Sequence, residues 1–150
     1  MRVRLDEDDG FERALVPALA ATKELDRVTE VVFDGYVSYS IYPAIDLPHL
    51  QALLASPHWR RLNRLELTFN EMDDAAATFL TSCLNLDRLV YLDLSHNHFT
   101  APGAELLLTS TRLPRLKRLF FEGNDLSPEE QANLTARFGG RICFLQADEG

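Results

Sequence analysis

The chain reads LVYLDLSHNHFT over residues 89–100, and this stretch decides the fold because it is one of three similar phrases. LNRLELTFNEMD begins at Leu62 and LKRLFFEGNDLS begins at Leu116, so each phrase starts 27 residues after the one before it. One asparagine in each phrase keeps the same step: Asn70, Asn97 and Asn124. A fixed period that carries a fixed polar residue indicates a repeat architecture.

Each phrase follows the pattern L-x-x-L-x-L-x-x-N-x-(L/M/F), which resembles a leucine-rich repeat. The long period, with a helix-like second half, is similar to the ribonuclease-inhibitor-like subclass, in the form of a short bacterial-type protein. The resemblance covers 62–138 and, less regularly, 28–61. It implies an α/β fold, namely a right-handed leucine-rich-repeat solenoid with a concave parallel β-sheet, convex helices, an N-terminal helical cap and a C-terminal closing strand. Members of the family are mostly protein-binding modules, although a fold alone does not determine function.

The period divides the chain into the parts of a single leucine-rich-repeat domain, 1–150. The parts are an N-terminal cap (1–27), repeats at 28–61, 62–88, 89–115 and 116–138, and a C-terminal cap and tail (139–150). Within the N-terminal cap, Met1–Asp9 is predicted to be a frayed, charged leader. A helix is predicted over Gly10–Glu24, where Pro17 marks the first turn or kinks the helix.

The apolar residues of each phrase occupy its first, fourth and sixth positions. Because alternate residues of a strand point to opposite faces, we expect these residues to fill the core. An asparagine side chain both donates and accepts hydrogen bonds. Asn70, Asn97 and Asn124 are therefore predicted to have a structural role, bonding the buried backbone of their own and neighbouring turns.

The second half of each regular repeat has helical spacing. Helices are predicted at Asp73–Leu84, Ala101–Ser110 and Pro128–Phe138, with Asp73, Thr100 and Ser127 as their N-caps. Ser127 and Glu130 form a capping-box motif. Gly139 and Gly140 are predicted to end the last helix, and Ile142–Leu145 to form a final strand.

The remaining strand positions form three rows across the predicted concave face. The rows are Glu30, Arg64, Tyr91, Arg118; Val32, Glu66, Asp93, Phe120; and Asp34, Thr68, Ser95, Glu122. In the first row Tyr91 lies between two arginines that are placed to stack on its ring. In the second row Glu66 and Asp93 are adjacent like charges. Arg64 and Arg118 offset them from within the chain, or a basic group on a partner does.

Two interpretations of this face stay open. One is a solvated sheet surface whose charges satisfy each other. The other is a partner-binding surface, with Tyr91 and Phe120 as exposed anchors and Glu66 and Asp93 as acceptors, because aromatic residues and arginine dominate interface energies. The candidate residues on or beside the strands are Arg64, Glu66, Phe69, Tyr91, Asp93, His96, Arg118 and Phe120.

A second candidate surface follows the first predicted strand. The first repeat is 34 residues long, seven more than the others, and the extra length falls in 35–48. This segment holds three of the four tyrosines of the chain: Tyr36, Tyr39 and Tyr42. Long loops on a rigid scaffold often carry function. The alternative is that the rings cover the edge of the first repeat as part of the cap.

Composition limits the partners and the compartment. A formal net charge of −8 disfavours general binding to nucleic acid or to anionic membranes, both of which require a basic surface. Cys83 and Cys143 do not make a disulfide framework, and we expect both to be reduced and buried. The N-terminal sequence makes a poor export signal. Together these features favour a cytoplasmic protein.

The sequence does not predict an enzyme. Asp93, Ser95 and His96 include the residue types of a hydrolytic triad, but strand neighbours point to opposite faces, and no oxyanion-hole loop is evident. His96 and His98 are separated by a turn and have no third metal ligand nearby. No phosphate-binding loop or dinucleotide fingerprint occurs, so no cofactor and no metal are predicted.

These observations predict a non-catalytic protein–protein interaction module. It would bind another protein through the concave face and the 35–48 loop, and a partner with a basic surface is one of the options left open. The class-distinct alternative is a structural or assembly protein that self-associates through its exposed aromatic rings. A bacterial origin rests only on the resemblance of the chain's ending to bacterial members of the family.

Overall fold

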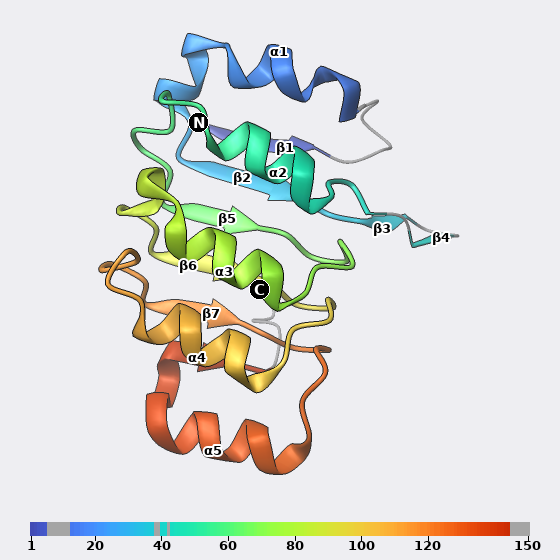
Figure 1. The fold of residues 1–150 in the computed structure, drawn as a ribbon, viewed down its shortest axis with the longest axis vertical. Coiled ribbons are helices and arrows are strands. Elements are labelled where there is room, and N and C mark those ends of the chain that lie inside the picture. The colour runs from blue at the N-terminus through green and yellow to red at the C-terminus, as the bar shows by residue number, and fades with distance from the viewer. Residues whose placement is uncertain (6–12, 38–39, 42, 145–150) are drawn as a thin grey trace.

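The computed structural model describes residues 1–5, 13–37, 40–41 and 43–144. Six parallel strands form one sheet in the order β1-β2-β5-β6-β7-β8. The strands are β1 (Arg2–Leu5), β2 (Glu30–Phe33), β5 (Arg64–Glu66), β6 (Tyr91–Asp93), β7 (Arg118–Phe120) and β8 (Ile142–Cys143). Since neighbours in the sheet are also successive strands of the repeats, the chain advances by one strand per repeat, as Figure 1 shows.

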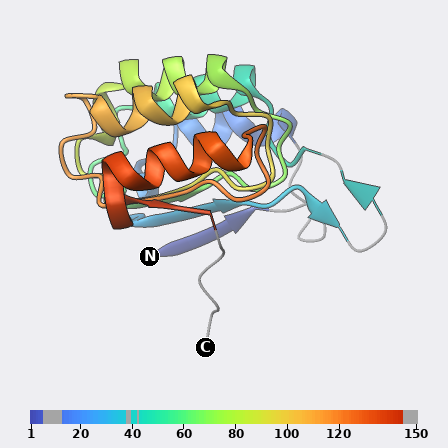
Figure 2. The same ribbon diagram turned by 90° about the horizontal axis from the view of Figure 1, so that it is seen from below.

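The α-helices of the described residues stack beside one another on one side of this sheet (Figures 1 and 2). They are α1 (Val16–Ala20), α2 (Leu47–Leu54), α3 (Asp74–Ser82), α4 (Ala101–Thr109) and α5 (Pro128–Phe138). Short 3₁₀ helices at Arg13–Leu15, Lys23–Arg27, Leu84–Leu86 and Gly139–Arg141 complete the connections. The alternation of strand and helix confirms the predicted α/β leucine-rich-repeat solenoid.

The N-terminal prediction is wrong in two respects. Arg2–Leu5 is not a frayed leader but strand β1, which pairs with β2 so that Val3 lies beside Val31. Residues 10–12 of the helix predicted over Gly10–Glu24 lie outside the described residues, and in the described remainder only Val16–Ala20 is α-helical, with a 3₁₀ helix following at Lys23–Arg27. Pro17 lies in the first turn of α1, where its missing N–H is tolerated.

The helix starts keep the 27-residue step in all four repeats. Asp46, Asp73, Thr100 and Ser127 are the N-cap residues of α2 to α5. Asp46, Asp73 and Ser127 accept backbone N–H groups of their own first turns, and Ser127 with Glu130 makes the predicted capping box. Thr100 occupies the predicted N-cap position but does not bond the first turn of α4, because its N–H and hydroxyl donate to the carboxylate of Asp74 in the preceding helix.

The seven extra residues of the first repeat therefore lie between the end of β2 and Asp46. The described parts of this segment form a small antiparallel pair, β3 (Tyr36–Val37) with β4 (Ser40–Ile41). In Figures 1 and 2 the pair extends beyond the carboxyl-terminal edge of the main sheet. Ile45 then returns to the core at 0% exposure.

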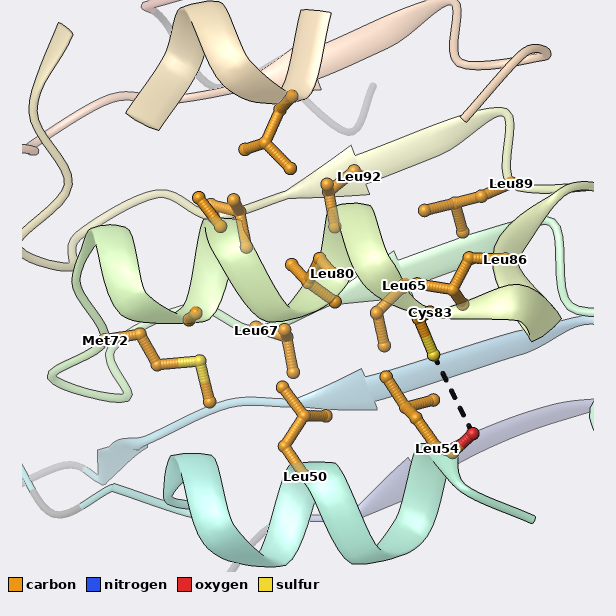
Figure 3. Close-up of a cluster of buried hydrophobic side chains, with 14 of the residues drawn as sticks. Leu50, Leu54, Leu65, Leu67, Met72, Leu80, Cys83, Leu86, Leu89 and Leu92 are labelled. Atoms are coloured by element: carbon orange, nitrogen blue, oxygen red, sulfur yellow. Dashed lines mark hydrogen bonds between the residues drawn. The ribbon is translucent and has the colours of Figure 1, made fainter. Parts of the chain in front are cut away.

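The core lies between the sheet and the helices. In Figure 3 the side chains of Leu50 and Leu54 from α2 face those of Leu80, Cys83 and the strand residue Leu65 from the next repeat. The thiol of Cys83 donates to the carbonyl of Leu54, with an Sγ to O distance of 3.8 Å. Burial raises the pKa of this thiol, which keeps it protonated and unreactive.

The second cysteine differs from the expectation. Cys143 is half-buried rather than buried, because β8 is the last described strand of the sheet. Both cysteines are free thiols.

The three repeat asparagines bond their turns in one common way. Asn97 Oδ1 accepts the N–H groups of Asn70 and Met72, at 2.9 and 3.1 Å. Its Nδ2 donates to the carbonyls of Leu67 and Leu94, at 2.8 and 2.9 Å, and to that of Ser95 at 3.2 Å. Each side chain thus joins its own turn to the turn of the preceding repeat.

The neighbouring asparagines repeat the pattern. Asn70 accepts from Ile45 and donates to Phe33. Asn124 accepts from Phe99 and donates to Leu94. Because these backbone groups are shielded from water, they need such partners in the folded state.

Replacement of Asn97 by alanine should lower the free energy of unfolding by about 3 kcal/mol, the upper end of the cost of orphaning buried polar groups, since two N–H and three carbonyl groups lose a partner. Urea denaturation followed by circular dichroism measures the change. The matched control is Asn133→Ala at an exposed position of α5, which should change the free energy by no more than about 0.5 kcal/mol. Equal losses of free energy of unfolding in both variants would contradict this structural role of the Asn97 side chain.

Candidate binding face

The face of the sheet opposite the helices carries the candidate site. Figure 2 shows α2 to α5 on one side of the strands, and among the described residues no helix covers the other side. The register confirms the first two predicted rows. Glu30, Arg64, Tyr91 and Arg118 lie side by side, as do Val32, Glu66, Asp93 and Phe120. Strand β1 extends these rows with Arg2 and Arg4.

Arg64 and Tyr91 form the centre of this face. The guanidinium carbon of Arg64 lies 3.8 Å from the ring centroid of Tyr91, which is the stacking that the sequence predicts. Arg64 Nε also donates to Glu66 Oε1 at 2.6 Å. Burial lowers the pKa of Arg64, but the hydrogen bond and the charge of Glu66 outweigh it, so this pKa lies above its ordinary value. The charged side chain is therefore fixed in one orientation.

Arg118 does not join this cluster. Its Nη1 donates to the carbonyl of Gly140 at 2.8 Å, so it turns toward the end of the chain and away from Tyr91. Tyr91 stacks on Phe120 instead, with ring centroids 4.6 Å apart. The like charges in the second row are thus offset from within the chain, by Arg64 rather than by Arg118.

Phe120 and Asp93 are more buried than the sequence predicts. Each is 7% exposed, although both lie on the open face. The ring of Tyr91 covers Phe120 on one side, and β8 pairs beside it on the other. Phe120 is therefore not an exposed anchor but a support beneath Tyr91, which remains half-buried.

Asp93 keeps its carboxylate in an unfavourable environment. Burial raises its pKa, and the charge of Glu66 raises it further, whereas hydrogen bonding from Ser95 and the charge of Arg64 act in the opposite direction. Asp93 Oδ1 accepts the N–H of Ser95 at 2.9 Å. The net result is a pKa above the ordinary aspartate value, so the ionised form costs stability.

A row of rings follows the carboxyl-terminal edge of the sheet. Phe69 and His96 are stacked with centroids 4.3 Å apart, and Tyr36 lies 5.2 Å from Phe69. Phe69 and His96 both have left-handed backbone, with φ of 57° and 56°, a conformation that costs about 1 kcal/mol for a residue with a side chain. Gly123 is the equivalent residue of the next repeat, and a Cβ there would meet the ring of His96 at 2.3 Å.

The other predicted site residues are placed as follows. Tyr36 is 56% exposed at the start of β3. Tyr39 and Tyr42 lie outside the described residues. Ser95 is 0% exposed, so a substrate cannot reach its hydroxyl. Among the described residues no cluster of three or more histidine, cysteine, aspartate or glutamate side chains is placed to hold a metal ion.

Comparison with known proteins agrees with this architecture. The leucine rich repeat family model matches residues 89–108, the stretch around Asn97. This match is confined to one repeat, and the fold as a whole is that of a leucine-rich-repeat solenoid. The match does not distinguish the ribonuclease-inhibitor-like subclass, which stays a prediction. No curated protein matches the chain by sequence.

Two solved structures share the repeat fold. A protein of Bacteroides fragilis superposes with a TM-score of 0.69 at 19% identity, over 93% of this chain and 40% of that one. Leiomodin-1 actin-binding site 2 superposes with a TM-score of 0.56 at 16% identity, over 83% of this chain and 68% of that one. At these identities the likeness concerns the fold. The chain spans less than half the length of the Bacteroides protein.

One finding bears on the membrane question. Within the described part of the chain, no helix is both long enough and apolar enough to cross a bilayer.

Sequence reasoning missed one feature of the structure. Arg61, Arg88 and Arg115 each precede the first leucine of a repeat, and together they line a groove of about 450 Å³. Their spacing of 27 residues is visible in the sequence, but these arginines precede the strands and lie outside the rows of the sheet face.

The raised pKa of Asp93 predicts a pH-dependent loss of stability. Between the ordinary aspartate pKa of about 3.9 and its raised value, the folded chain holds a proton that the unfolded chain has released. The ionised group therefore destabilises the fold above the raised pKa, and this cost disappears as the pH falls through it. Asp93→Asn should be more stable than the wild type by about 1 kcal/mol at neutral pH, with the difference shrinking toward about pH 4.

Urea denaturation of both chains across this pH range measures the difference. Asp87→Asn is the matched control, since Asp87 is exposed and its replacement should leave the pH profile unchanged. If the free energy of unfolding of the wild type instead rises relative to that of Asp93→Asn as the pH increases, the carboxylate stabilises the fold and the prediction is wrong.

Proposed function

We propose that this chain is a non-catalytic protein-binding module that holds its partner against the open face of the sheet and the 35–48 loop. The observation that supports the proposal is the Arg64–Tyr91 stack, which stands on a sheet face with no covering helix among the described residues. Leucine-rich repeat proteins commonly bind other proteins through such extended concave surfaces. The similar domain of leiomodin-1 is named an actin-binding site.

The stack has the composition and the rigidity of an interface anchor. Tyrosine and arginine are among the residues that dominate binding energies. Glu66 fixes the guanidinium of Arg64, and Phe120 supports the ring of Tyr91, so both side chains are ordered before a partner arrives. Ordering in advance lowers the entropy lost on binding.

The ring row of Tyr36, Phe69 and His96 extends the proposed surface toward the 35–48 loop. These rings form a continuous series, because each contacts the next. The left-handed backbone of Phe69 and His96 lies at this edge of the sheet, and strained residues of this kind cluster at functional sites. The partner meets the Arg64–Tyr91 stack at its centre and the ring row at its border.

The charge of the partner follows from the same contacts. Glu66 and Asp93 have partners within the chain, so the face does not require a basic partner. Binding energy comes mainly from aromatic and arginine contacts, with the exposed Arg118 at the border of the surface. Two free thiols support the further proposal of a cytoplasmic setting.

Affinity capture from native lysate, read by quantitative mass spectrometry, tests the binding face. The variant Tyr91→Ala with Arg64→Ala removes the stack and should reduce capture of the partner by at least about tenfold. The matched control is Leu84→Ser with Leu106→Ser, which removes two exposed apolar side chains from outside the sheet face. Circular dichroism establishes that both variants fold.

If the first variant no longer captures the partner and the control still does, the result would support the concave face as the binding site. Equal capture by the wild type and the first variant would contradict it. Multi-angle light scattering distinguishes the alternative of self-association through exposed rings. A dimer that becomes a monomer in Tyr39→Ser with Tyr42→Ser would favour the assembly role.

A further inference from the structure

A second surface lies at the amino-terminal edge of the sheet, formed by residues that precede the strands. An arginine directly precedes the first apolar position of all four repeats: Arg27, Arg61, Arg88 and Arg115. Because the repeats stack in register, the last three stand one above another before β5, β6 and β7. We refer to Arg61, Arg88 and Arg115 as the arginine column.

The arginine column lines a groove. The groove has a volume of about 450 Å³, and its walls are completed by Thr29, Asn63 and Val90. A second groove of about 440 Å³ continues along the same edge, lined by Leu116, Lys117, Arg118, Gly140 and Arg141. Three of those five residues, Lys117, Arg118 and Arg141, are also basic, on a chain whose net charge is −8.

The charges of the column are not neutralised within the described residues. Elsewhere arginines find carboxylates, as Arg4 does with Asp34, Arg60 with Asp26 and Arg137 with Glu105. All three members of the column are exposed, and no ion pair joins any of them to a carboxylate of the described chain.

This separation is notable because acidic residues outnumber basic ones in the sequence. Asp87 adjoins Arg88 in the chain, yet it too lacks an ion pair within the part of the chain that the structure describes. The guanidinium groups are therefore available to a ligand.

We propose that the arginine column binds an acidic segment of a partner polypeptide. The planar fork of a guanidinium matches the two oxygens of a carboxylate. Strands in a sheet are about 4.8 Å apart, so the column spans about 10 Å. In an extended peptide the side chains on one face lie about 7 Å apart, so two carboxylates at alternate positions fit within this span, and each is within reach of two neighbouring arginines.

The groove favours a polypeptide over other anions. A nucleic acid is held by a wide basic surface and by aromatic rings on which its bases stack, and the lining of the groove contains no aromatic ring. A single small anion requires convergent donors, whereas these three exposed side chains are spread along an edge. This binding goes beyond the proposed function, because it does not depend on the Arg64–Tyr91 stack.

Fluorescence anisotropy with a fluorescein-labelled peptide of eight glutamates tests the proposal at about 20 mM salt, where ionic attraction is weakly screened. The wild-type chain should bind the peptide, and binding should weaken as salt rises. The variant Arg61→Gln with Arg88→Gln and Arg115→Gln should bind at least tenfold more weakly. The matched control is Arg4→Gln with Lys23→Gln and Arg137→Gln, which has the same net charge and should bind within twofold of the wild type.

Circular dichroism establishes that both triple variants are folded. Loss of binding confined to the column variant would support the proposal. Absence of binding by the wild type, or an equal loss in the control, would overturn it. A single-stranded oligonucleotide of equal charge serves as a second probe, and tighter binding of that probe than of the peptide would overturn the assignment of a polypeptide ligand.

Discussion

The structure depends on satisfying buried backbone groups where each strand ends. A parallel solenoid must turn sharply at this point in every repeat, and the turn lies against the next one, out of reach of water. Asn70, Asn97 and Asn124 supply both donors and acceptors at this place, and each bonds two successive repeats. No apolar residue can replace them, because the five groups bonded by Asn97 would then lose their partner. The 27-residue period is the spacing at which one such side chain reaches the next turn.

This constraint does not fix the residues at other positions of the repeat. Because the repeats stack in register, side chains at equivalent positions form a column. Leucines repeated toward the helices make the core, whereas residues repeated on the opposite face make rows. Three groups of side chains therefore lie on separate parts of one sheet, namely its two edges and its open face. Aromatic rings gather at its carboxyl-terminal edge, an arginine–tyrosine stack occupies its open face, and arginines line its amino-terminal edge.

The sequence predicted the features that the 27-residue period determines, above all which strand residues lie side by side. It placed Arg64, Tyr91 and Arg118 in one row, because a fixed step between strands determines the register. It failed where a residue acts outside its repeat. Arg118 turns to Gly140, and Tyr91 covers Phe120, and neither contact has a signal in the period. Strand β1 was missed for a different reason. Its alternation of arginine with Val3 and Leu5 is a strand pattern, but the acidic run after it suggested a solvated leader.

The column of repeated asparagines (Asn70, Asn97 and Asn124) and the arginine column have opposite effects on the stability of the fold. The asparagine column stabilises the chain, since its hydrogen bonds replace those that water would make. The arginine column does the reverse, because like charges about 5 Å apart repel by nearly 1 kcal/mol per pair even in water, although the flexible side chains reduce this by moving apart. The described chain supplies no carboxylate to offset the repulsion, while it supplies one to Arg64 on the open face. A repeated charge that contributes nothing to packing and is left unpaired is best explained by a ligand, which would remove the repulsion when it binds.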